Sequence, residues 1–302
     1  MKLVRRREVR NAAMLSLAVS PVASGAAWIF SQHNARVTSL ATLAISALVF
    51  AVLSRRWITR WALLRAPVDP EVLAILQREV TFYRELSAED QREFVRNVRC
   101  FLHEHSITGA RREAVSLTTR VLVAASASML LFAREDLDLP TRIDVVVYAE
   151  AFDLDYQVSR GGEVLGLAHA QGPVVLSERA LREGFARARD GLHVGVHEFA
   201  HMLDLEGAHF DGIPVGLDGA AARSWAGLVH REMQRIDRGR SILRAYGATS
   251  EQEFFAVATE AFFERPVALR EKHPEVYETL KRFYGQDPAH KSKTTDPATS
   301  PG

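Results

Sequence analysis

The residues of this 302-residue chain that could carry out chemistry include one short segment, His197-Glu198-Phe199-Ala200-His201. On a helix, positions four apart lie on the same face, so His197 and His201 can present ring nitrogens to one metal ion. Glu198 follows the first histidine, where its carboxylate can accept a proton from a water activated by that ion. The pattern predicts a catalytic zinc site in which Glu198 is the general base.

A helix must carry this pattern, and the surrounding residues favour one. From Asp190 onward, apolar residues are interspersed with polar ones in a way that a helix sorts onto faces, and Gly207 is a plausible end. Histidines and a glutamate buried on such a helix would each need a partner, which a metal site provides. The competing interpretation is that they are ordinary exposed polar residues.

A catalytic zinc needs a third protein ligand, and the spacing leaves several candidates open. A second apolar helix is predicted over residues 250–263 with Ser250 as its N-cap. On that helix Glu253 and Glu260 lie two turns apart on one face, and composition does not choose between them. Asp204 is better placed to orient a ligand histidine than to bind the metal. The downstream candidates are Asp204, Glu206, His209, Asp211, Asp218, Glu251, Glu253 and Glu260.

The elements around these helices predict an α+β fold that is mainly helical with a small mixed sheet. Helical patterns cover residues 70–105 and 118–132, whereas β-branched runs predict strands over 143–148 and 172–177, with 164–168 as a further candidate. The strand Val174 to Leu176 is expected to offer an edge on which an extended peptide can pair.

Other histidines and the single cysteine have weaker interpretations. His103 and His105 are two positions apart on a predicted helix and point to nearly opposite sides, so we expect a solvated helix end and no metal site there. Cys100 is the only cysteine, which excludes an intrachain disulfide framework and a cysteine-rich zinc site. His169 has no assigned role.

The N-terminal residues 1–65 have a different composition and predict a membrane anchor. Two uncharged stretches, 11–32 and 37–54, each approach the length of a membrane-spanning helix. Basic residues flank the pair, while the insert between the stretches carries only Arg36, so the positive-inside rule predicts a helical hairpin with both ends in the cytoplasm. Two alternatives remain open: a signal peptide that leaves an outward-facing anchored protein, and a pair of buried soluble helices.

The charge of the chain is unevenly divided between its parts. The net charge is +1, but residues 1–65 hold ten basic residues and one acidic residue, so residues 66–302 carry a net charge of −8. An acidic soluble part argues against a nucleic-acid partner. We therefore expect a membrane anchor over 1–65, a linker over 61–70, a catalytic domain over 66–290 and a disordered tail over 291–302.

Several separated segments occur in an order typical of one protein family. They are Phe82-Tyr83-Arg84-Glu85-Leu86-Ser87, Phe101-Leu102, Gly172-Pro173-Val174-Val175-Leu176-Ser177, His197 to Asp204, Asp211-Gly212-Ile213-Pro214, Glu253-Phe254-Phe255-Ala256-Val257 and Glu260-Ala261-Phe262-Phe263. Together they resemble the Mlc titration factor A family of zinc metallopeptidases, from about Pro70 to Pro288.

The resemblance implies a zincin-like catalytic fold similar to the peptidase domain of anthrax lethal factor. It implies that His197, His201 and Glu253 bind one Zn²⁺ ion and that Glu198 is the general base. Tyr246 matches an active-site tyrosine of the family, whose phenol could donate to a developing oxyanion. Asp204 and Glu260 are then expected to support the ligands from outside the metal's direct contacts.

These observations predict a zinc-dependent peptidase that hydrolyses a peptide or protein substrate, with aminopeptidase-like cleavage as one form of that activity. The alternative is a regulatory binding protein that sequesters a transcriptional repressor, as the resemblance implies, with zinc mainly structural. The expected location is the cytoplasmic membrane with the catalytic domain facing the cytoplasm. The alternative location is the soluble cytoplasm, which is typical of the family.

Overall fold

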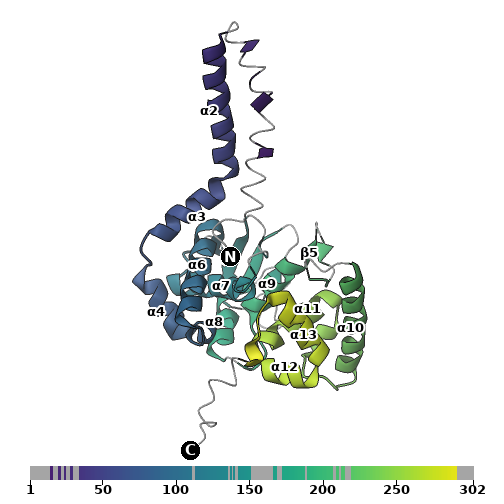
Figure 1. The fold of residues 1–302 in the computed structure, drawn as a ribbon. Coiled ribbons are helices and arrows are strands. Elements are labelled where there is room, and N and C mark those ends of the chain that lie inside the picture. Colours follow the sequence, from purple (N-terminus) through teal and green to yellow (C-terminus); the bar gives the residue numbers. More distant parts are fainter. Residues whose placement is uncertain are drawn as a thin grey trace, which may run out of the picture. The chain divides into compact units, whose positions relative to one another are not determined.

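The structure of the protein is a computed structural model (Figure 1). It describes residues 34–110, 113–134, 142–150, 172–187, 189–206, 212–214 and 219–290, with short pieces elsewhere that include 166–168 and 209–210. The predicted disordered tail and His169 lie outside the described residues. Contacts divide the chain into two units, Lys2–Pro67 and Val68–Gly302.

The first unit contains helices α2 (Ala35–Leu53) and α3 (Arg55–Arg65). Most of the predicted first helix, 11–32, lies outside the described residues, but two of its serines contact α2. Ser20 Oγ lies 2.8 Å from Ser46 Oγ, and Ser24 Oγ lies 3.1 Å from Thr42 Oγ1. From Ser20 to Ser24 the chain moves forward, whereas their partners move backward from Ser46 to Thr42. The two stretches therefore run antiparallel.

The second unit is mainly helical, as predicted. Side chains of Ser87, Ser116, Ser177 and Ser250 accept backbone N–H groups and begin helices α6, α7, α8 and α11. The helices are α4 (Pro70–Glu79), α5 (Thr81–Arg84), α6 (Ala88–Glu104), α7 (Leu117–Leu131), α8 (Glu178–Ala186), α9 (Val194–Asp204), α10 (Gly219–Asp237), α11 (Glu251–Glu264), α12 (Pro266–Lys272) and α13 (Pro274–Tyr284).

A small mixed sheet completes the α+β fold. Its strands are β1 (Ser106–Gly109), β2 (Asp144–Tyr148), β3 (Gly166–Ala168) and β4 (Val174–Ser177), in the order β1-β2-β4-β3. β1, β2 and β4 are parallel, whereas β3 pairs antiparallel with β4. The expectation that Val174 to Leu176 offers a free edge is therefore wrong, because β4 is paired on both sides. β3 forms the edge instead. A two-stranded pair, β5 (Leu205–Glu206) and β6 (His209–Phe210), follows α9.

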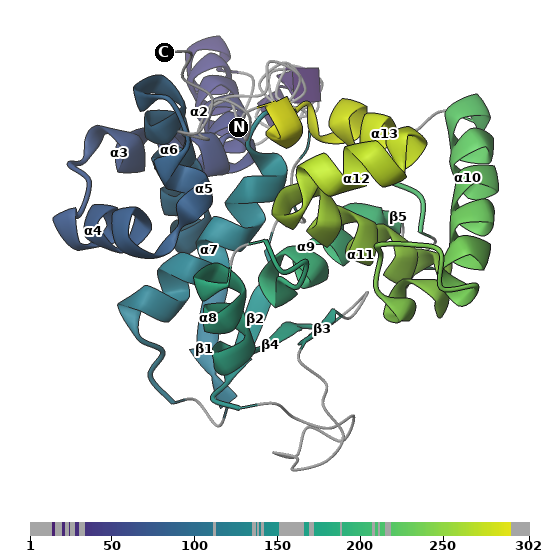
Figure 2. The same cartoon turned by 90° about the horizontal axis from the view of Figure 1, so that it is seen from below.

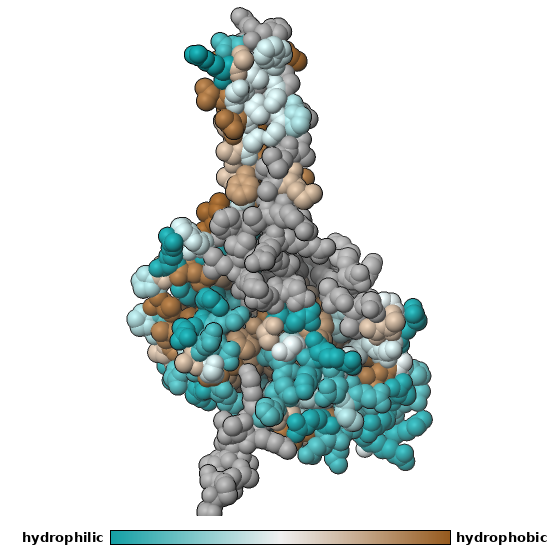
Figure 3. Space-filling view, viewed as in Figure 1, coloured by the Kyte–Doolittle hydropathy of each residue, from teal (hydrophilic) through white to brown (hydrophobic). Residues whose placement is uncertain are grey.

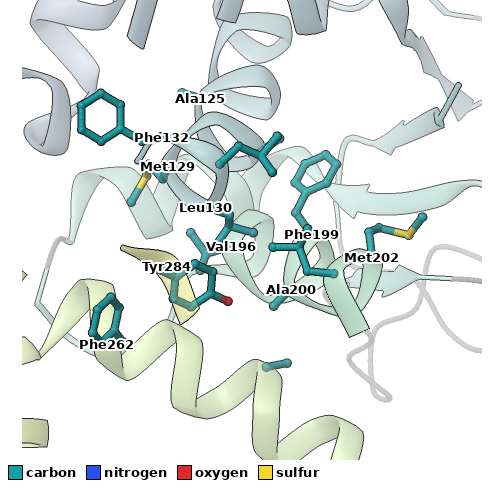
Figure 4. Close-up of a cluster of buried hydrophobic side chains, with 14 of the residues drawn as sticks. Ala125, Met129, Leu130, Phe132, Val196, Phe199, Ala200, Met202, Phe262 and Tyr284 are labelled. Atoms are coloured by element: carbon teal, nitrogen blue, oxygen red, sulfur yellow. The ribbon is translucent and has the colours of Figure 1, made fainter. Parts of the chain in front are cut away.

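The core forms where α7 and α9 pack against each other (Figure 4). Apart from Arg120, α7 is apolar or small all round, and most of its residues are buried. The two helices approach closely at Gly195, where an added Cβ would lie 2.2 Å from Ser126 Oγ. Val196 and Phe199 of α9 meet Leu130 of α7 in the same cluster. The helix that carries the two histidines is thus fixed by core packing on its opposite side.

The structure also corrects the interpretation of the second histidine pair. His103 is exposed, but His105 is buried at the end of α6 rather than solvated. Its Nδ1 accepts the backbone N–H of Ile143 at 3.0 Å, next to the first residues of β1 and β2. A buried imidazole here satisfies a backbone donor at the start of the sheet.

Candidate active site

The two histidines of the motif lie on one face of α9, as the spacing predicts. Both side chains are buried, and their ring centroids are 4.9 Å apart at 84°. α9 lies between the sheet and α11, and it contacts α11 along much of its length (Figure 2). The histidine-bearing face of α9 therefore meets α11, the helix that carries the predicted carboxylate candidates Glu253 and Glu260.

Glu253 is the carboxylate that α11 brings to the histidines. Ser250 caps α11 by accepting the Glu253 N–H, which fixes the first turn of the helix. Glu253 Oε2 lies 3.0 Å from His197 Nε2 and 3.6 Å from His201 Nε2, and the three potential ligand atoms lie within 4.8 Å of one another. Ligand atoms around a tetrahedral zinc are about 3.4 Å apart, given bonds of about 2.05 Å. Two imidazoles and a carboxylate at these separations fit a zinc ion.

Glu260 lies two turns further along α11, behind His197. Its Oε1 is 2.7 Å from His197 Nδ1 and also accepts from Arg244, while its Oε2 accepts the backbone N–H of His193 at 2.6 Å. A carboxylate on Nδ1 keeps the proton on that nitrogen and directs Nε2 toward Glu253. Glu260 therefore lies where a residue that orients a ligand histidine is needed.

The ionisable groups show a strongly negative environment around the histidines. Burial lowers the pKa of His197, but the carboxylates of Glu260 and Glu253 outweigh it and raise the pKa to about 10. Burial raises the pKa of Glu253, but hydrogen bonds from His197 and His201 hold it well below its ordinary value. Burial keeps the pKa of His201 below its ordinary value. Such a donor set attracts a cation, whether a proton or a metal ion.

Glu198 and Tyr246 flank the three candidate ligands. Glu198 is buried on α9, next to His197 in sequence. Tyr246 lies on the short 3₁₀ helix Ala245–Ala248, with its ring centroid 6.0 Å from that of His197. The Tyr246 side chain is half-exposed, and partial burial together with Glu253 raises its pKa to about 12. The phenol is therefore a neutral hydrogen-bond donor beside the site at pH 7.

The remaining third-ligand candidates lie elsewhere or outside the described side chains. Asp204 is buried at the end of α9, and its Oδ2 accepts the Gly212 N–H at 2.9 Å. Glu251 is exposed at the start of α11. The side chains of Glu206, His209, Asp211 and Asp218 are outside the described part of the structure.

Two contacts of the site were not expected from the sequence. Arg244 reaches Glu260 from the loop before Tyr246, and the backbone N–H of His193 reaches it from the start of α9. His193 carries a signal that could have drawn attention to it, because it precedes His197 by four residues. Arg244 carries none, because its contact depends on a loop that only the folded chain brings near α11.

Comparisons with known proteins place this chain in a family. An uncharacterized protein of Synechocystis sp. is 27% identical over 240 residues, which cover 75% of this chain and 87% of that protein. Mlc titration factor A of Yersinia pestis is 31% identical over 192 residues, 54% of this chain and 67% of that protein. Mlc titration factor A of Edwardsiella ictaluri is 37% identical over 133 residues, 41% of this chain and 49% of that protein. The profile described as Glucose-regulated metallo-peptidase M90 matches residues 54–285, and this chain belongs to that metallopeptidase family.

Proposed function

We propose that this protein is a zinc-dependent peptidase whose metal is held by His197, His201 and Glu253. The observation that carries the proposal is the convergence of three buried or half-buried ligand atoms within 4.8 Å, contributed by α9 and α11. The metallopeptidase family supports a metal-dependent reaction. A zinc ion bound there supplies a Lewis acid that polarises the scissile carbonyl and lowers the pKa of a water.

The neighbouring residues supply the proton transfers. Glu198 accepts the proton of the attacking water and passes it to the departing amine. Tyr246 remains protonated at neutral pH, so its hydroxyl can donate a hydrogen bond to the oxyanion. Glu260 holds His197 in one tautomer throughout.

The substrate is an extended peptide that pairs with β3. This strand is at the edge of the sheet and contacts α9, which carries the histidines. Among the described strands, none pairs with its outer edge, which can add a peptide strand by backbone hydrogen bonding. Release of amino-terminal residues, as in an aminopeptidase, is a finer form of this proposal.

Metal analysis beside a peptidase assay on the full chain tests the proposal. We expect one zinc ion per chain and hydrolysis of short chromogenic peptides that a chelator abolishes. Glu198→Gln should keep the zinc and lose hydrolysis, whereas Glu253→Ala should lose the zinc. Tyr246→Phe should keep the zinc and lower kcat by roughly 10²–10³-fold.

Matched controls come from neighbouring residues of the same type. Glu251→Ala removes an exposed carboxylate from the same helix as Glu253, and His103→Ala removes an exposed histidine. Both should behave as the wild type. Hydrolysis by Glu198→Gln at the wild-type rate would reject Glu198 as the base, and zinc-free hydrolysis would reject the whole mechanism.

A second candidate function is regulatory binding. The relatives from Edwardsiella ictaluri and Yersinia pestis bear the name Mlc titration factor A. By that likeness, this chain would sequester a transcriptional repressor, with zinc mainly structural. A zinc-loaded protein without hydrolytic activity that nevertheless retains a repressor on an affinity column would favour this function.

We also propose that the first unit anchors the protein in a membrane. Among the described residues, α2 is the one helix that is long and apolar enough to cross a bilayer. Its Leu40 and Leu43 are 68% and 67% exposed, whereas Thr42 and Ser46 face the antiparallel stretch. Apolar side chains outside and hydroxyls between helices suit a lipid environment.

A further inference from the structure

A cavity of about 350 Å³ is lined by residues of α5, α7, α8, α11 and α12, among others. Its wall combines aromatic side chains from three elements (Phe82, Phe185 and Phe263) with two buried polar groups, His193 and Glu264. None of His197, His201 and Glu253 lines it. An apolar cavity of this size with a few convergent polar groups is typical of a small-molecule site.

His193 presents a hydrogen-bond donor that lacks a partner. The side chain is 1% exposed, and its Nδ1 accepts the Val196 N–H at 3.2 Å. An imidazole that accepts at Nδ1 carries its proton on Nε2, and Nε2 has no partner within the described part of the chain. Its ring packs edge-on against Phe185, and both residues line the cavity. A ligand oxygen would satisfy this donor.

Glu264 presents a carboxylate whose charge is poorly compensated. Burial raises its pKa to about 7, although its Oε2 accepts the backbone N–H of Arg189 at 2.5 Å. Arg189 has a φ of 84° and is the non-glycine residue with positive φ among those described. Such strain is retained where the surroundings require it, often at a ligand site. A cationic group of a ligand would stabilise the Glu264 carboxylate.

Arg265 adds a positive charge to the wall of the same cavity. Its side chain is half-buried against Gly191, and its Nη1 lies 3.5 Å from the Ile242 carbonyl oxygen. A guanidinium in the same wall as a neutral imidazole donor suits a carboxylate. The wall therefore contains a carboxylate that can bind an ammonium group, donors that can bind a carboxylate, and an aromatic surface.

We infer that this cavity binds a free apolar α-amino acid, with its ammonium group on Glu264, its carboxylate on His193 Nε2 and Arg265, and its side chain among Phe82, Phe185 and Phe263. The site is linked to the candidate zinc centre, because the His193 N–H and His197 Nδ1 share the carboxylate of Glu260. If the proposed peptidase function holds, the amino acids that bind in this cavity are products that peptide hydrolysis releases.

Calorimetric titration of the full chain in detergent, after metal removal by a chelator, tests the inference. Metal removal prevents binding of the amino acid to zinc, so the result does not depend on peptidase activity. L-phenylalanine should bind, whereas N-acetyl-L-phenylalanine, L-phenylalaninamide and glycine should each bind at least ten-fold more weakly. Each of these probes lacks one of the three recognised groups.

Single substitutions test which residue binds which group of the amino acid. Glu264→Gln should bind L-phenylalanine at least ten-fold more weakly than the wild type does, with about the affinity that the wild type has for the N-acetyl derivative. Arg265→Met should bind L-phenylalanine with about the affinity that the wild type has for L-phenylalaninamide. Glu271→Gln, an exposed carboxylate on α12, should leave binding unchanged. The inference is overturned if L-phenylalanine does not bind at millimolar concentration, or if the N-acetyl derivative binds equally well. Undiminished binding to both Glu264→Gln and Arg265→Met would also overturn it.

Discussion

Glu260 connects three parts of the site through one carboxylate. It is fully buried, and its oxygens contact His197 Nδ1, the His193 N–H and the Arg244 guanidinium. Burial raises the pKa of Glu260, but His197 and Arg244 outweigh it and keep the carboxylate ionised. A charged acceptor behind a ligand histidine raises the basicity of the ring and fixes its orientation.

Replacing Glu260 by Gln keeps the shape but removes this charge. We expect the affinity for zinc to fall by roughly 10–100-fold, measured by competition with a chromogenic chelator. Glu251→Gln, on the same helix but exposed, is the matched control and should bind zinc like the wild type. Equal affinity of Glu260→Gln and wild type would show that the contact does not support the metal.

Glu264 gives the stability of the fold a specific dependence on pH. Burial raises its pKa from 4.5 to about 7, so the folded chain holds this proton more tightly than the unfolded chain. Glu264 therefore contributes most to stability below about pH 4.5. As the pH rises to about 7 this contribution is lost, and the free energy of unfolding falls by about 3 kcal/mol in total.

Thermal unfolding of the metal-free chain in detergent checks this dependence. Gln resembles the protonated side chain, so Glu264→Gln should match the wild type near pH 4.5 and exceed its Tm by several degrees at pH 8. Glu271→Gln should show no such difference at either pH. A constant difference between Glu264→Gln and the wild type across this range would contradict the raised pKa.

At the scale of elements, the sequence predicts the two helices that carry the candidate ligands, whereas it gives no prediction for α8, α10, α12 and α13. Spacing alone predicts the shared face of His197 and His201, and Ser250 predicts the start of α11. The sequence does not predict β1, because Ser106 to Gly109 has little strand pattern and is held by pairing with β2, far along the chain. The contact of Arg244 with Glu260 was missed for the same reason: it depends on tertiary packing rather than on local preference.

The loop that carries Arg244 is held by a buried chain of hydrogen bonds. His273 Nδ1 lies 2.6 Å from Glu232 Oε2, and His273 Nε2 lies 3.1 Å from Ser241 Oγ and 3.3 Å from Ile242 N. Burial raises the pKa of Glu232, but His273 and Arg235 outweigh it and lower the pKa. These contacts connect α10 and the start of α13 to the loop just before Tyr246.

His273→Ala should break this chain and leave Glu232 buried with one partner fewer. We expect the free energy of unfolding, measured with urea, to fall by roughly 3 kcal/mol. The kcat of peptide hydrolysis should fall while the zinc content is retained, because the loop positions Tyr246. His230→Ala, an exposed histidine on α10, should change neither quantity. Unfolding of His273→Ala at the wild-type urea concentration would exclude a stabilising role.

At the scale of the whole molecule, the two units distribute apolar surface in opposite ways. The unit from Val68 onward buries most of its large apolar side chains, and its visible surface is mainly hydrophilic (Figure 3). α2 instead exposes Leu40, Leu43, Leu48 and Val52 and directs the hydroxyl groups of Thr42 and Ser46 toward Ser24 and Ser20. A helix with exposed leucines is unfavourable in water but favourable in the hydrocarbon of a bilayer.

Membrane fractionation of cells that express the full chain tests this contrast. The wild type should remain in the pellet after alkaline carbonate extraction, and protease should digest the second unit in inside-out vesicles only. Leu43→Lys combined with Leu48→Lys should release the protein, because a lysine near the centre of a span costs about 2.5–3.5 kcal/mol. Leu73→Lys, at an exposed leucine of α4, should stay in the pellet. Release of the wild type by carbonate would show that α2 is covered by protein rather than by lipid.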